Sequence, residues 1–202
     1  MESYKLAHLP SHLSHIHAAL YVDVSDAAAL KRRLIAAAAA EGDEGEQERA
    51  ALNFAFIDAR LITSLALLKA AIYSAVLSEA QGRLLTKTVH SEIIWTLNPT
   101  NNISEAMRRY GVSETSTSLV AVRVAGPELP PAAIQRAMSA AIRGTPVPFT
   151  DLAKQTDWAA VKKYHKLAND TAIRDAKDNI DMEHAIIDEI VVSCAAIKCV
   201  QA

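Results

Sequence analysis

The feature that most constrains the fold is the stretch of residues 86–124, TKTVHSEIIWTLNPTNNISEAMRRYGVSETSTSLVAVRV, because each element expected there ends at a clear signal. Residues 92–97 form a short, nearly continuous apolar run rich in β-branched and aromatic side chains, which predicts a buried strand central in a sheet. Asn98-Pro99 ends this run, since the residue before a proline is pushed out of the helical region. Residues 119–124 predict a second strand.

A helix is expected between these two strands, over residues 103–110. Asn102 can accept a hydrogen bond from the first turn, and Glu105, three positions later, can reach back to the Asn102 amide, which together make a capping box. Gly111 follows the helix directly, and glycine is the residue that a left-handed helix C-cap prefers.

The rest of the chain shows the same alternation of elements. Strands are expected over residues 4–9, 13–22 and 54–58, and helices over residues 25–40, 64–81, 131–143, 158–168 and 181–200. Residues 41–50, rich in acid and glycine, predict a disordered, solvated loop. The fold class is therefore α/β (α+β): one domain spanning residues 1–202, with a central mixed sheet of about four to five strands and about seven to eight helices.

The central stretch also resembles a known family. It matches S-E-I-I-x-x-L-x-P-x-N-N-I-S-E-A-x-x-x-[FY]-G-[IV], the most distinctive segment of the kinase-binding subunit of the KEOPS (EKC) complex, the PRPK-binding protein family, and the chain is similar to a fungal member. Three shorter segments agree in order: Phe54 to Ile62, Val161 to Leu167 and Ile187 to Ile190. The resemblance covers nearly the whole chain apart from about residues 41–50.

The resemblance implies a non-catalytic protein with no cofactor. In that family, the subunit docks on a small atypical kinase/ATPase, contacts the other KEOPS subunits through it, and helps to recruit tRNA by its single-stranded 3' CCA end for threonylcarbamoyladenosine (t6A) modification. The resemblance also implies a link to telomere maintenance and transcription, and a location in the nucleus and the cytoplasm. The first nine residues lack the apolar core of a signal peptide, so a soluble intracellular protein without a membrane partner is expected.

Two predicted helices carry more apolar surface than one packed face requires, so one of them is expected to dock the kinase. On the last helix the candidates are Ile187, Ile190 and Val191, and on the helix over residues 64–81 they are Leu68 and Ile72. Which helix docks stays open at this point.

Candidate tRNA contacts cluster around the matching stretch. They are residues that could bind phosphates or the edges of unpaired bases: Lys87, His90, Asn101, Asn102, Arg108 and Arg109. The family usually has Arg where Lys87 stands, so phosphate recognition there is expected to be weaker. Asn102 has a second interpretation, because its expected role as the cap of the helix over residues 103–110 would account for it without any ligand. A net charge of -2 argues against nucleic-acid binding by bulk electrostatics, so any such site must be local.

No sequence motif indicates catalysis. There is no Gly-rich phosphate loop, H-E-x-x-H or G-x-S-x-G, and the histidines at 12, 15 and 17 have no carboxylate or cysteine at ligand spacing, so no metal site is expected. The alternative is a small ligand-binding domain or enzyme with a pocket at the carboxyl ends of the strands over residues 54–58 and 92–97. Asp58 and His90 are its only candidate titratable groups.

Overall fold

The structure is a computed structural model that describes residues 1–201, with side chains described to residue 198. Its strands are β1 Glu2–Lys5, β2 His15–Val22, β3 Ala55–Asp58, β4 Leu119–Ala125 and β5 Thr145–Val147. Its α-helices are α1 Ala27–Ala39, α2 Gly42–Ala51, α3 Leu65–Ala80, α4 Val89–Leu97, α5 Ile103–Tyr110, α6 Pro131–Ala141, α7 Trp158–Tyr164, α8 Thr171–Asp175 and α9 Ile180–Gln201. The 3-10 helices are η1 Ser11–Leu13, η2 Ala59–Leu61, η3 Phe149–Lys154 and η4 Leu167–Asn169. None of the helices within residues 1–201 is long and apolar enough to cross a membrane.

The five strands form one sheet in the order β1-β2-β4-β3, with β5 paired to β2 beyond the end of β1. This confirms the α+β class. Every strand pairing found within the described residues is antiparallel, so the expectation of a mixed sheet is wrong. The reason is that residues 92–97 do not enter the sheet.

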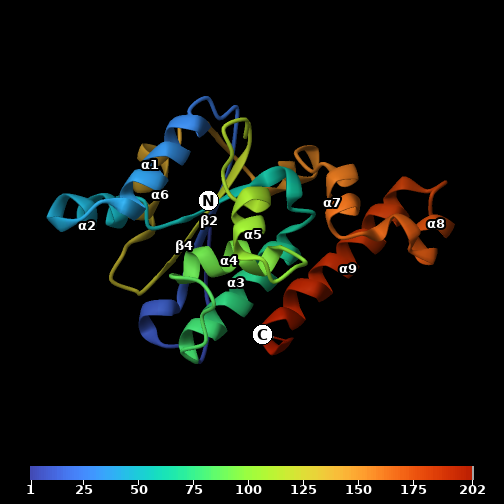
Figure 1. Ribbon diagram of the computed structural model, residues 1–202, viewed down its shortest axis with the longest axis horizontal. Helices are drawn as coiled ribbons and strands as arrows, with labels where there is room; N and C mark the ends of the chain where they lie inside the picture. Colours follow the sequence, from blue (N-terminus) through green and yellow to red (C-terminus); the bar gives the residue numbers. More distant parts are fainter. Residues whose placement is uncertain (202) are drawn as a thin grey trace.

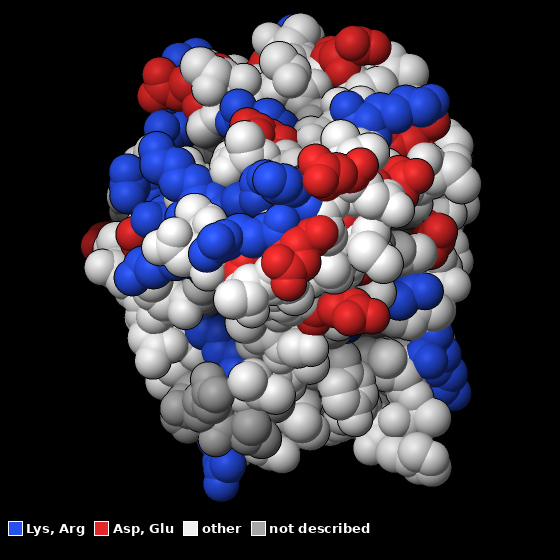
Figure 2. Space-filling view, turned by 90° about the vertical axis from the view of Figure 1, so that its right-hand side faces the viewer, with Lys and Arg blue, Asp and Glu red and all other residues white. Residues whose placement is uncertain are grey.

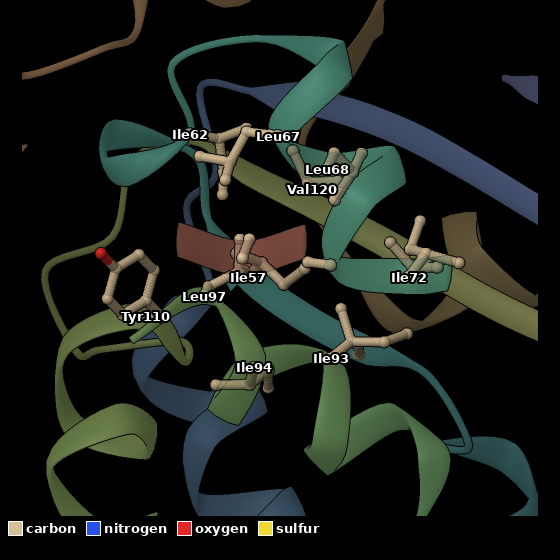
Figure 3. Packing of buried hydrophobic residues seen from close by; sticks show 14 of the residues in the cluster. Ile57, Ile62, Leu67, Leu68, Ile72, Ile93, Ile94, Leu97, Tyr110 and Val120 are labelled. Atoms are coloured by element: carbon tan, nitrogen blue, oxygen red, sulfur yellow. The ribbon is translucent and has the colours of Figure 1, made fainter. Parts of the chain in front are cut away.

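The two faces of the sheet are covered by different helices (Figure 1). Along β2, Ile16, Ala18 and Leu20 belong to one buried cluster, whereas Ala19 and Tyr21 belong to the other, as the two-residue period of a strand requires. The first cluster packs under α3, α4 and α9, and the second under α1 and α6. Figure 3 shows the first cluster, where side chains of α3 and α4 meet those of β3 and β4.

Residues 92–97 are helical, not a strand: they form most of α4. Thr88 caps this helix by accepting from the Ser91 amide at 3.1 Å, and the Ser91 hydroxyl accepts from the Thr88 amide at 3.1 Å. The Glu92 carboxylate accepts from the Thr86 amide at 2.8 Å and holds the preceding loop. An apolar run that is buried all round fits a strand or a buried helix equally well, and here the capping box decides in favour of the helix.

The acidic stretch over residues 41–50 is also helical, so the expectation of disorder is wrong. Arg33 of α1 pairs with Glu48 of α2 at 2.8 Å. The Arg49 guanidinium donates to the carbonyl oxygens of Ala37 and Ala40 at the end of α1. A Cβ at Gly45 would lie 2.7 Å from the Ala40 oxygen, so glycine lets the two helices approach closely. The acidic side chains lie on the solvated side of a packed helix.

Candidate functional site

The loop between α4 and α5, residues 98–102, is the centre of the candidate site because three helices meet there. The Lys198 ammonium of α9 donates to the carbonyl oxygens of Trp95 at 2.6 Å, Thr100 at 3.0 Å and Asn98. It also lies 3.9 Å from the centre of the Trp95 ring, and the Trp95 indole donates to the Asn101 carbonyl at 3.3 Å. Burial lowers the pKa of Lys198 to about 8, against the opposing effect of Glu92. One buried ammonium thus ties the loop to the last helix.

The start of α5 combines a predicted cap with an unpredicted contact. Asn102 accepts from the Glu105 amide at 2.9 Å, which confirms its capping role. The Glu105 carboxylate does not return to Asn102 but accepts from the Thr100 hydroxyl at 2.6 Å, which lowers the pKa of Glu105. Gly111 has φ −73° and ψ 167°, so the expected left-handed cap is wrong. Glycine is needed there because a Cβ would lie 2.5 Å from the Met107 oxygen.

A cavity of about 200 Å³ opens beside this loop. It is lined by the loop and α4 on one side and by α9 and His165 on the other: Thr96, Leu97, Asn98, Pro99, Asn101, His165, Cys194, Ala195, Ile197 and Lys198. A hydrogen bond of 2.9 Å between the Tyr110 hydroxyl and Nε2 holds the His165 ring in place. Burial lowers the pKa of His165 to about 4, so the imidazole is neutral at pH 7. A larger hollow of about 560 Å³ on α6 is shallow and lies outside this loop.

The contact between Tyr110 and His165 brings the ends of α5 and α7 together. Beside it, the Arg109 guanidinium lies 4.4 Å from the centre of the Tyr164 ring and pairs with Glu105 at 2.6 Å. Arg108 of α5 and Lys163 of α7 are exposed. Figure 2 shows Lys and Arg side chains gathered in a band on the face that α7 to α9 present, with acidic side chains next to it. On this face, therefore, basic side chains are gathered locally in a chain whose net charge is -2.

Five of the six candidate tRNA contacts lie at or close to the surface, although Lys87 is at the opposite end of α4 from the loop over residues 98–102. Lys87 precedes α4, and Asn101, Asn102 and Arg108 are exposed on the loop and α5, with Arg109 partly buried beside them. His90 is different, because it is only 5% exposed and its Nε2 accepts from the Val124 amide at 3.0 Å. This burial is inconsistent with the prediction that His90 contacts RNA. The hydrogen bond from Val124 shows instead that His90 joins α4 to β4.

The candidate kinase contacts lie mostly inside the chain's own core. Ile187, Val191, Leu68 and Ile72 are at most 1% exposed, and only Ile190 is half-buried. The prediction that α3 and α9 carry a surplus of apolar surface is wrong for these residues, because the two helices pack against each other and against the sheet. Among the described side chains, the large apolar ones that α3 and α9 expose are others: Tyr73, Ile180, Met182 and Ile197.

The two described cavities do not include the alternative pocket expected near Asp58 and His90. Residues 92–97 do not end a strand, and neither Asp58 nor His90 lines either of the two described cavities. Asp58 is 1% exposed, and its carboxylate accepts hydrogen bonds from the side chains of Arg60 and Ser116. These bonds account for a buried carboxylate at this position without a ligand. Within the described residues no group of three or more potential metal ligands occurs.

Comparison with known proteins finds relatives over most of the chain. The family model described as kinase binding protein CGI-121 matches residues 21–198. The chain is 39% identical over 183 residues to the EKC/KEOPS complex subunit cgi121 of Neurospora crassa, covering 83% of each chain. It is 34% identical over 185 residues to the subunit of the same name in Aspergillus fumigatus, covering 90% of this chain and 92% of that one. On this evidence the chain belongs to the CGI-121 family of kinase-binding proteins and is similar to its fungal members.

Proposed function

We propose that this protein is a non-catalytic subunit of the KEOPS (EKC) complex, in which it binds the small atypical kinase/ATPase and helps to recruit tRNA by its 3' CCA end for t6A modification. The observation that carries the proposal is the family match over residues 21–198, together with relatives that are named as subunits of this complex. Contact with the other KEOPS subunits through the kinase, a link to telomere maintenance and transcription, and a location in nucleus and cytoplasm belong to the same proposal.

The kinase is proposed to dock on apolar side chains that the chain leaves exposed. At the start of α9, Ile180 is 64% and Met182 is 55% exposed. Isolated exposed apolar residues are ordinary on soluble proteins. Ile180 and Met182 both lie in the first turn of α9, where positions i and i+2 point to different sides. Each is a separate candidate contact in a protein whose family is described as kinase binding.

The tRNA end is proposed to bind beside the loop over residues 98–102. The Asn101 and Asn102 amides are exposed on a backbone that Lys198 holds in place, so edge contacts to an unpaired base would need little further ordering. Arg108 and Lys163 provide charge for the phosphates of a single strand. The neutral imidazole of His165 and apolar side chains such as Leu97, Pro99 and Ile197 also line the cavity, so the site offers both polar and apolar contacts.

Replacing Arg108 and Lys163 together by alanine is expected to weaken binding of an RNA hairpin with a single-stranded CCA end by about tenfold. Each lost phosphate contact also lowers the dependence of log K on log salt by about 0.7 for a single strand, so the slope should fall by about 1.4. Fluorescence anisotropy at several salt concentrations measures both quantities.

The matched control is Arg32→Ala/Arg136→Ala, which removes the same charge from exposed positions on α1 and α6, on the other side of the sheet. It should leave affinity within about twofold, since α1 and α6 cover the opposite face of the sheet and the effect of exposed charges is largely screened beyond about 8 Å at physiological salt. Equal losses in the two double variants would mean that only net charge matters, and the proposed RNA site would be rejected.

A further inference from the structure

Arg60 is held at the surface by a carboxylate that is itself buried. The Asp58 side chain is 2% exposed, whereas that of Arg60 is 45% exposed. Asp58 Oδ1 accepts from Arg60 Nε at 3.0 Å, and Oδ2 accepts from Arg60 Nη2 at 2.8 Å, so the two groups meet fork to fork. The Ser116 hydroxyl donates to Oδ2 at 2.7 Å and fixes the carboxylate from the other side.

This arrangement leaves part of the guanidinium unused. The two bonds to Asp58 take one N–H from Nε and one from Nη2, out of the five N–H groups that an arginine carries. The remaining N–H groups lie on the Nη edge of a side chain that is nearly half exposed. Because the fork already fixes the side-chain torsions, an anion that binds this edge does not have to immobilise a flexible arginine.

Arg60 lies against the start of α7, the helix that carries Lys163. The Arg60 carbonyl accepts from the Asp157 amide at 2.8 Å, which places η2 against the start of α7. Asp58, Asp157 and Tyr164 all act electrostatically on Arg60, and the Arg109 guanidinium lies 4.4 Å from the centre of the Tyr164 ring. Tyr164 thus interacts with both guanidinium groups, and Lys163 precedes it on α7.

We propose that Arg60, oriented by Asp58, is a phosphate-binding residue that receives the RNA strand where it runs past Tyr164 and Arg109, away from the loop over residues 98–102. The inference rests on the proposed function for its natural ligand, a phosphodiester of single-stranded RNA. The inference adds to the proposed function an RNA contact on a second element, Arg60 of η2, and a positioning residue, Asp58, whose carboxylate orients Arg60.

The first experiment compares RNA affinities of Arg60→Gln and Arg60→Lys with the wild type, using the CCA-ended hairpin. Arg60→Gln should bind about fivefold to tenfold more weakly, with a salt slope smaller by about 0.7. Arg60→Lys keeps the charge but cannot reproduce the fork, so we expect the slope of the wild type and a loss of about threefold. The control Arg136→Gln, on α6, should bind as the wild type does.

A purely structural role predicts a different pattern. If Arg60 only satisfies Asp58, then Arg60→Gln lowers the midpoint of urea unfolding but binds RNA with wild-type affinity at concentrations of urea where it is folded. That result would overturn the proposal.

A second readout separates this inference from the proposed function. The Nε–H signal of Arg60 in a ¹H–¹⁵N spectrum, assigned with Arg60→Lys, is followed as inorganic pyrophosphate is added. A saturable shift in the millimolar range at Arg60 and none at Arg136 is expected even if the protein binds no RNA, in which case the anion site stands and the proposed function fails. No shift at Arg60 would reject the site.

Discussion

Ile187→Glu is expected to unfold the chain, with a loss of about 5 kcal/mol in the free energy of unfolding, because it places a carboxylate in the centre of the core. Ile187 is fully buried in the cluster that α3, α4 and α9 form with the sheet. A charged group there has no partner and no route to water. Urea denaturation followed by circular dichroism measures the loss directly.

The matched control is Met182→Glu, on the same helix but 55% exposed, which should change the free energy of unfolding by no more than about 0.5 kcal/mol. This pair decides how kinase binding must be tested. Loss of binding in Ile187→Glu would report unfolding and not docking, whereas loss in a folded Ile180→Glu/Met182→Glu variant would locate the docking surface. An Ile187→Glu variant as stable as the wild type would contradict the packing described here.

Stability is expected to fall steeply as the pH is lowered below about 6.5, and His90 is the main cause. Burial lowers the pKa of His90 to about 3, with a smaller contribution from Arg123. Between the unfolded pKa of about 6.5 and the folded pKa, the unfolded chain binds a proton that the folded chain does not. Acid therefore favours unfolding by about 1.4 kcal/mol per pH unit for this residue, and its contribution is fully present only above about pH 6.5.

His165 adds to the same effect over a narrower range, because burial lowers its pKa to about 4. The measurement is the free energy of unfolding in urea at several pH values between 7 and 4. His90→Gln should be less stable at pH 7 but should flatten the profile, since the amide oxygen can still accept from the Val124 amide and does not titrate. A His90→Gln profile parallel to that of the wild type would show that His90 does not carry the acid sensitivity.

Elements with local end signals were predictable from the sequence. Ser64 caps α3 by accepting from the Leu67 amide at 3.1 Å, Pro131 opens α6, and β4 covers the expected strand over residues 119–124. In contrast, the sequence of residues 92–97 predicts a strand where the structure has a helix, because an all-buried apolar run has no period that separates strand from helix. The Thr88 and Ser91 capping box was the available signal for the helix.

The candidate site was predictable only in part. The exposure of Asn101, Asn102 and Arg108 follows from a polar loop and the outer face of a short helix. The contact from Lys198 to Trp95 joins residues 103 positions apart, so no local pattern could indicate it. The chemistry of histidine made His90 a candidate RNA contact, but whether a histidine faces water or the core depends on the elements that pack against it. In this structure β4 packs against His90.

The central claim, that this chain is the kinase-binding subunit of a KEOPS complex, is tested most directly by calorimetric titration with the small KEOPS kinase from the same organism. The account predicts one-to-one binding by the wild type, with a dissociation constant of about 1 µM or tighter. A folded protein that produces no binding heat at any temperature tested, and does not co-elute with the kinase, would contradict it.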